Sequence, residues 1–130
     1  MDSEARTLRF LVVDDNEDIR DVFCRLVERA GHHASTASDG QDAVEVLERE
    51  SFDVMLLDLT MPRMNGVDVV RWIRARPDVA PRMRIVVISA WAGEHRAVLQ
   101  ELGVVTVMQK PLRIQQLTDL IEETLLDSES

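Results

Sequence analysis

Residues 8–15 read LRFLVVDD, an apolar run that ends in two aspartates. Two further runs have the same form: residues 53–58 read DVMLLD, and residues 104–108 are followed closely by a Lys-Pro pair. Consecutive apolar residues are typical of strands that are buried on both faces of a parallel sheet. The sequence therefore predicts buried parallel strands whose charged ends lie together at one edge of a sheet.

Amphipathic segments alternate with these short runs, which is the pattern of an α/β protein with a doubly wound sheet. Asn16 is placed to cap a first helix that Gly31 ends, and Asp39 and Gly40 turn the chain into a second. The expected strands are residues 8–13, 32–37, 53–58, 85–89 and 104–108, and a fourth helix is expected over residues 94–102. The last helix is expected to bury Ile114, Leu117, Leu120 and Ile121.

The chain has 130 residues and a formal net charge of −9. We expect one domain over residues 1–130, with a core of about 7–126 and a tail or linker start at 127–130. The negative charge argues against direct nucleic-acid binding, and no apolar stretch is long enough to cross a membrane. One cysteine, Cys24, and an opening without signal-peptide features indicate a reducing cytoplasm.

In open parallel sheets, ligands bind beyond the carboxyl ends of the strands. That rule selects Asp14, Asp15, Asp58, Ser89 and Lys110, which is the only lysine in the chain. Three converging carboxylates repel one another unless a cation lies among them, and Mg²⁺ prefers hard oxygen ligands. We therefore expect a divalent cation at this edge, with the lysine ammonium beside it.

Phosphoryl transfer to a carboxylate needs a nucleophile, a cation on the transferring oxygens and a donor that senses the new group. Asp58, the metal with Lys110, and the Ser89 hydroxyl can fill those three roles. A lysine suits the second role because its ammonium is a compact point charge with rotatable donors.

The chain resembles the receiver domain of bacterial two-component response regulators over nearly its whole length. Five separated motifs carry the resemblance in the family's order: Asp14-Asp15, Asp58, the loop from Met61 to Gly66, Ser89-Ala90 and Lys110-Pro111. The resemblance implies a flavodoxin-like fold with five strands in the order 2-1-3-4-5. It also implies that Asp58 accepts a phosphoryl group from the phosphohistidine of a sensor histidine kinase or a histidine phosphotransfer protein.

The same resemblance implies the remaining site roles. Asp15 and Asp58 would bind Mg²⁺ (or Mn²⁺) directly, Asp14 would act mainly through water, and the Thr60 backbone carbonyl would supply another ligand. Ser89 and Lys110 would hold the phosphoryl oxygens, and the Lys110-Pro111 bond would be cis. The face of the fourth helix, fifth strand and last helix would bind a downstream protein, an effector domain or a twin subunit. Such a domain is a signalling phosphoacceptor and not a metabolic enzyme.

Three positions depart from the family pattern. Val107 stands where the family usually has an aromatic ring that moves inward on phosphorylation, and Leu112 stands where phenylalanine is common. Trp91 lies two residues after the serine, where a large ring can block the water that hydrolyses an acyl phosphate. We therefore expect Trp91 to lengthen the lifetime of the phosphoryl group.

Three other functions compete with this interpretation. An aspartyl-phosphate hydrolase needs an Asp-x-Asp pair after the first strand, which Asp14-Asp15-Asn16 does not supply. A flavodoxin-like cofactor binder needs a phosphate-cradling loop at the same place, where these acids repel a phosphate. A pseudo-receiver that only binds partners would lack an acid or the lysine.

The remaining polar residues have simpler interpretations. His32 and His33 are expected to be polar residues of an edge strand, and Cys24 a small residue on the flank of the first helix. The one basic cluster is interpreted as a charged surface that balances an acidic protein; it comprises Arg71, Arg74, Arg76, Arg82 and Arg84.

Overall fold

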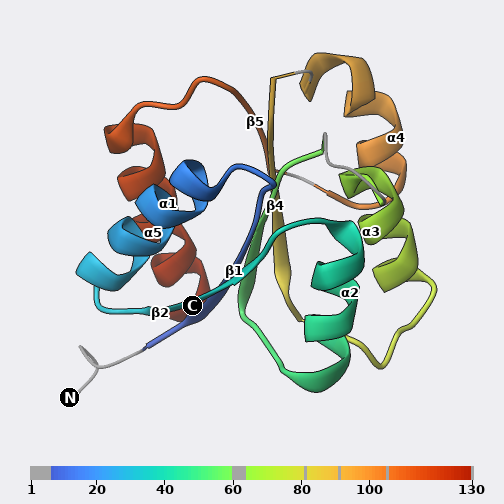
Figure 1. Ribbon diagram of the computed structural model, residues 1–130, viewed down its shortest axis with the longest axis horizontal. Helices are drawn as coiled ribbons and strands as arrows, with labels where there is room; N and C mark the ends of the chain where they lie inside the picture. The colour runs from blue at the N-terminus through green and yellow to red at the C-terminus, as the bar shows by residue number, and fades with distance from the viewer. Residues whose placement is uncertain (1–6, 60–63, 81, 91, 105, 130) are drawn as a thin grey trace.

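The computed structural model describes residues 7–59, 64–80, 82–90, 92–104 and 106–129. Within these residues, strands and helices alternate along the chain (Figure 1). The strands are β1 (Arg9–Val13), β2 (His33–Ala37), β3 (Val54–Leu57), β4 (Arg84–Ser89) and β5 (Thr106–Gln109). The helices are α1 (Glu17–Arg29), α2 (Gly40–Arg49), α3 (Gly66–Arg74), the 3₁₀ turn η2 (Ala92–His95), α4 (Arg96–Glu101) and α5 (Ile114–Glu129).

The described strands form one parallel sheet in the order β2-β1-β3-β4-β5, which confirms the predicted fold and strand order. Figure 1 shows α1 and α5 on one face of this sheet and α2, α3 and α4 on the other. Strand order reverses between β1 and β3, so the chain leaves their carboxyl ends toward opposite sides. The crevice expected at such a switch point therefore lies beside the residues that follow Val13 and Leu57.

Among the described residues, two apolar clusters make the core, one on each face of the sheet. Alternate residues of the central strands enter different clusters, as the two-residue period of a strand requires. In β3, for example, Met55 and Leu57 face the helices α2, α3 and α4, whereas Val54 and Leu56 face α1 and α5. Burial on both faces holds this strand, and the acid that follows it, in a fixed position.

Side-chain caps start three of the helices in the described residues; the sequence predicts the cap at Asn16 and the turn at Asp39, but not the cap at Asn65. The side chains of Asn16, Asp39 and Asn65 accept hydrogen bonds from the backbone N–H groups of residues three positions later. The fourth helix differs from the prediction of one helix over 94–102. Its first part is the turn η2, and His95 at the start of α4 supplies no side-chain cap.

The structure corrects three further expectations about boundaries and burial. β5 begins at Thr106 and not at Val104, because the Val104 N–H donates to the Leu99 carbonyl at 2.9 Å at the end of α4. Ile114 is 65% exposed, since it is the first residue of α5, whereas Leu117, Leu120 and Ile121 are buried as expected. α5 also continues to Glu129, into the stretch expected to be a tail.

His32 is also not the polar edge residue that we expected. It precedes β2 and is buried, and its Nδ1 accepts a hydrogen bond from the Leu8 N–H at 3.1 Å. His33 is exposed, so the two rings do not share one environment. Cys24 is half-buried on α1, and burial raises the pKa of its thiol, which agrees with an unreactive packing role.

Candidate functional site

The ends of β1, β3 and β5 bring together three charged residues that are far apart in the sequence. The Asp58 N–H donates to the Val13 carbonyl at 2.9 Å, which aligns the ends of β3 and β1. The Lys110 N–H donates to the Ser89 carbonyl at 3.0 Å, which aligns the ends of β5 and β4. The sheet ladder therefore sets the positions of Asp14, Asp58 and Lys110 before their side chains interact.

Among the described residues, Asp14, Asp15 and Asp58 form a carboxylate cluster. One oxygen from each lies within 4.8 Å of the others. Asp14 is 2% exposed and Asp58 is 6% exposed, whereas Asp15 is exposed to solvent. Two unit charges at this distance repel each other by about 3.5 kcal/mol at an effective dielectric constant of 20, so the cluster favours a cation.

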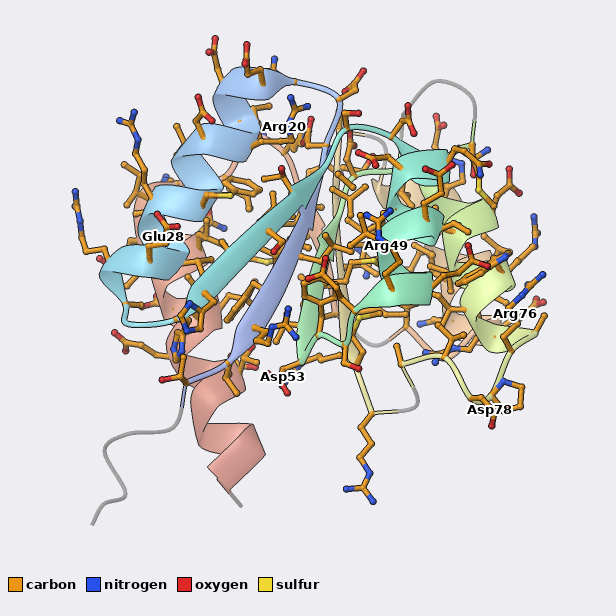
Figure 2. All side chains as sticks on the ribbon, turned by 60° about the horizontal axis from the view of Figure 1, so that its bottom comes forward. Arg20, Glu28, Arg49, Asp53, Arg76 and Asp78 are labelled. Atoms are coloured by element: carbon orange, nitrogen blue, oxygen red, sulfur yellow. The ribbon has the colours of Figure 1, made fainter. Side chains whose placement is uncertain are left out.

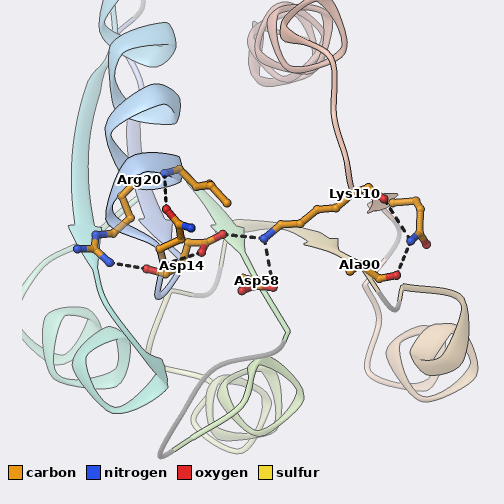
Figure 3. Close-up of polar contacts among 8 residues, drawn as sticks. Asp14, Arg20, Asp58, Ala90 and Lys110 are labelled. Atoms are coloured by element: carbon orange, nitrogen blue, oxygen red, sulfur yellow. Dashed lines mark hydrogen bonds and ion pairs between the residues drawn. The ribbon is translucent and has the colours of Figure 1, made fainter.

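Lys110 supplies part of the compensating charge (Figure 3). Its Nζ donates to Asp14 Oδ2 at 3.0 Å and lies 3.7 Å from Asp58 Oδ1. The lysine side chain is 22% exposed, so these contacts are only partly screened by water. Three carboxylates and one ammonium leave a formal charge of two negative units, which matches a divalent cation.

The loop that carries Asp14 and Asp15 is held by hydrogen bonds of its own. Asp14 Oδ1 accepts from the Asn16 N–H at 3.0 Å, and Asn16 caps α1 by accepting from the Ile19 N–H. Arg20 Nη1, one turn into α1, donates to the Asp14 carbonyl at 2.7 Å (Figure 3). These contacts fix the backbone of the acidic loop on the helix that follows it.

Ser89, the last residue of β4, is fully buried beside this edge. Gln109, the last residue of β5, donates through its side-chain amide to the carbonyls of Ala90 and Lys110 (Figure 3). Roles for Arg20 and Gln109 were not predicted from the sequence, because both side chains donate to backbone carbonyls that only the fold brings within reach. The one signal in the sequence for the role of Arg20 is its position one helical turn after the Asn16 cap, from which its side chain can reach back to the acidic loop.

The loop after β3 approaches the acid directly. The Gly66 N–H donates to the Leu59 carbonyl at 2.9 Å, and a Cβ added to Gly66 would lie 2.6 Å from the Asp58 carbonyl oxygen. This glycine lets the start of α3 pack against the backbone of Asp58. Thr60 and Trp91, for which the sequence predicts functional roles, lie outside the described residues.

The donor set fits a hard divalent cation. The cluster offers carboxylate oxygens, which Mg²⁺ and Mn²⁺ prefer, and contains none of the imidazole or thiolate ligands that favour zinc or copper. In Figure 3 the Lys110 ammonium reaches both Asp14 and Asp58, and Asp15 is the exposed member of the cluster. The Lys110-Pro111 bond is cis, as the sequence predicts.

The sheet carries a carboxylate cluster at its switch point, with the Lys110 ammonium beside it, which places the chain among the α/β proteins that bind ligands at the carboxyl ends of parallel strands. The family model "Response regulator receiver domain" matches residues 10–122, and the chain belongs to that family. It is a phosphoacceptor receiver domain of two-component signalling. This confirms the family and function that the sequence predicts.

Two curated relatives illustrate the family. The sensory/regulatory protein RpfC of Xanthomonas campestris is 30% identical over 123 residues, which are 93% of this chain and 17% of RpfC. The alkaline phosphatase synthesis transcriptional regulatory protein PhoP of Bacillus subtilis is 33% identical over 122 residues, which are 93% of this chain and 50% of PhoP. The chain thus spans at most half the length of these two relatives.

The fold is also similar to solved structures. A CheY-like response regulator receiver domain protein from Methanospirillum hungatei has a TM-score of 0.84 at 25% identity, with 95% of this chain and 98% of that chain covered. A sensor protein from Polaromonas sp. JS666 has a TM-score of 0.83 at 26% identity, with 94% and 98% covered. In the described part of the chain, we find no helix with the length and apolar content that a membrane span requires.

Proposed function

We propose that Asp58 accepts the phosphoryl group. The observation that carries this proposal is the placement of its carboxylate, which is 6% exposed, within 4.8 Å of two other acids and 3.7 Å from the Lys110 ammonium. Mg²⁺ (or Mn²⁺) would be held by Asp14, Asp15 and Asp58, together with the Thr60 backbone carbonyl. When bound, the cation would neutralise charge on the phosphoryl oxygens.

The reaction follows from these positions. A carboxylate oxygen of Asp58 attacks the phosphorus of a phosphohistidine on a partner protein. The bond between phosphorus and the imidazole nitrogen breaks, and its electron pair stays with the imidazole, which takes a proton from water. Asp58 is left as an acyl phosphate. The Lys110 ammonium then exchanges its Asp14 contact for a phosphoryl oxygen, and the Ser89 hydroxyl donates to another.

The partner that supplies the phosphoryl group is a sensor histidine kinase or a histidine phosphotransfer protein. An apolar hollow of about 360 Å³ lies beside the site, between α1 and the loop after β5. Ile19, Val22, Phe23 and Leu112 line it, and Lys110 lies at its border. An apolar surface that is continuous with the phosphoacceptor site is suited to dock the donor, because the docked protein can present its histidine to Asp58.

The phosphorylated domain passes the signal on through its surface. A phosphoryl group on Asp58 biases an equilibrium between two shapes, and the face formed by α4, β5 and α5 presents the change to a downstream protein, an effector domain or a second copy. The domain catalyses only its own phosphorylation and dephosphorylation. A cytoplasmic setting, in which the thiol of Cys24 stays reduced, belongs to the same proposal.

The proposal is tested by incubating the protein with acetyl phosphate and Mg²⁺ and measuring its intact mass. We expect the mass of one phosphoryl group on the wild type, and none on Asp58→Asn or when EDTA replaces Mg²⁺. Asp78→Asn changes an exposed aspartate of the loop after α3 and should be labelled like the wild type. A failure to label the wild type, under conditions that label another receiver domain, would support a partner-binding scaffold instead.

A further inference from the structure

The side chain of Gln109 links two loops at the phosphoacceptor edge. Its amide nitrogen Nε2 donates to the carbonyl oxygen of Ala90, in the loop after β4, and to the carbonyl oxygen of Lys110 at 3.3 Å (Figure 3). Both acceptors are carbonyl oxygens, which cannot donate. The NH₂ group must therefore face them, and its two hydrogens match the two acceptors.

This amide extends the sheet ladder by one step. Ser89 and Gln109 are the last paired residues of β4 and β5, and the Lys110 N–H donates to the Ser89 carbonyl at 3.0 Å. Beyond that bond the ladder ends. The Gln109 side chain then holds the next carbonyl of the β4 loop, that of Ala90, against the next carbonyl of the β5 loop, that of Lys110.

The two carbonyls belong to the backbone that carries the two phosphoryl-contacting side chains. Ala90 directly follows Ser89, and Lys110 is itself the ammonium donor. Their side chains must reach the same phosphoryl group from two different strand ends. A tie between these ends limits the freedom of both donors together, and such pre-organisation strengthens binding because less motion is lost when the ligand binds.

We propose that Gln109 is a positioning residue for the phosphoryl group, acting through Ser89 and Lys110. This inference rests on the proposed role of Asp58 as phosphoacceptor. Gln109 is exposed, and a hydrogen bond of this kind makes a modest net contribution. Loss of the amide should therefore weaken phosphoryl binding roughly two- to ten-fold while leaving the fold intact.

The test uses Gln109→Met, which keeps an unbranched side chain of similar length and removes the donor. Gln41→Met is the matched control. Gln41 is an exposed glutamine on α2, outside the loops after β4 and β5, and its side-chain amide donates to the Glu45 carboxylate at 3.4 Å. Three quantities are measured: the affinity for Mg²⁺, the affinity for beryllofluoride in saturating Mg²⁺, and hydrogen exchange of the backbone amides in η2. Beryllofluoride serves as a stable mimic of the phosphoryl group.

We expect Gln109→Met to bind beryllofluoride roughly two- to ten-fold more weakly than the wild type, with unchanged Mg²⁺ affinity, and its η2 amides to exchange faster. Gln41→Met should match the wild type throughout. If Gln109→Met weakened the binding of Mg²⁺ as much as that of beryllofluoride, the role of Gln109 would be purely structural and the proposal would be overturned. Unchanged or tighter binding of beryllofluoride by Gln109→Met would also overturn it. If the wild type binds no beryllofluoride, the Asp58 proposal fails, and the exchange comparison then decides by itself whether Gln109 fixes the loop.

Discussion

Lys110 shows how one side chain determines the character of the site. It is the only lysine of the sequence, and its Nζ contacts both Asp14 and Asp58. A guanidinium would need a planar arrangement of acceptors, whereas the ammonium can turn its three hydrogens from one carboxylate to a new anion. The lysine can therefore stabilise the cluster and also follow charge that arrives on Asp58.

His32 is a buried histidine at the other end of the sheet. Figure 2 shows Arg20 of α1 near the carboxyl ends of the strands and Asp53 at the opposite end. Because His32 Nδ1 accepts from the Leu8 N–H, the neutral ring carries its proton on Nε2, which is buried and has no hydrogen-bond partner among the described residues. Burial lowers the pKa of His32, a like charge on His33 acts the same way, and the Asp53 carboxylate opposes them.

This environment predicts a loss of stability in weak acid. The unfolded chain takes up a proton on this histidine near pH 6.5, which the folded chain resists because its pKa is lower. The contribution of His32 is therefore complete above that pH and declines as the pH falls below it. The measurement is the free energy of unfolding in urea at pH 7.5 and at pH 5.5. Between these two pH values it should fall less in His32→Asn than in the wild type. Asparagine is chosen because its side-chain oxygen can still accept the hydrogen bond from the Leu8 N–H.

His33→Asn is the matched control, because it removes the neighbouring exposed histidine. It should lose nearly as much stability between the two pH values as the wild type does, because burial, the main cause of the low pKa of His32, is unchanged. An equal loss in His32→Asn and the wild type would show that the buried ring does not resist protonation.

At the scale of elements, the start of α3 packs so closely on the residues after β3 that a Cβ at Gly66 would clash with their backbone. A Cβ on Gly66 would lie 2.6 Å from the Asp58 carbonyl oxygen and 2.8 Å from the Leu59 Cα, both backbone atoms of fixed position. The start of the helix or the backbone of the acid must move to make room. We expect Gly66→Ala to lower the free energy of unfolding by about 1–3 kcal/mol and to slow labelling of Asp58 by acetyl phosphate.

Gly93→Ala provides the comparison, because a Cβ there meets no atom within 4 Å. Gly93→Ala should have the same free energy of unfolding in urea as the wild type and the same rate of labelling by acetyl phosphate. If Gly66→Ala were equally stable and equally reactive, the close packing of α3 on the Asp58 backbone would be wrong.

The elements that the sequence predicts well are those whose signals are local. Asp14, Asp58 and Lys110 each follow an apolar run, so the rule for parallel sheets was sufficient to place them at one edge. The start of α4 was predicted poorly, because a 3₁₀ turn and an uncapped His95 leave no signal in the sequence. The burial of His32, the exposure of Ile114 and the contacts of Gln109 depend on neighbours that are distant in sequence.

At the scale of the molecule, apolar surface is exposed beside the site. Among the described residues, two large hydrophobic side chains are exposed to solvent. Val22 on α1 is 46% exposed, and Ile114 on α5 is 65% exposed. Val22 borders the hollow at Lys110 and, with Ile114, a second smaller hollow along α1. Both hollows include Phe23 and Leu112, so the apolar surface runs from the site along the helix.

This surface predicts that a protein donor and a small donor will respond differently to one substitution. Val22→Arg places a charge in the hollow and should slow transfer from a phosphorylated histidine kinase roughly ten-fold, because the apolar contact is lost. Labelling by acetyl phosphate should not change, since that molecule needs no docking surface. Ala97→Arg, at an exposed position on α4, is the control; equal rates in all three proteins would place the docking surface elsewhere.

The most direct test of the central claim is to locate the phosphoryl group. The protein is incubated with acetyl phosphate and Mg²⁺ and then reduced with borohydride, which converts an aspartyl phosphate to homoserine. Peptide sequencing by mass spectrometry then identifies the converted residue. We predict homoserine at position 58, its formation dependent on Mg²⁺, and unmodified aspartate at positions 14 and 15. Homoserine at another aspartate, or at none in a protein that binds Mg²⁺, would contradict the assignment of Asp58 as the phosphoacceptor.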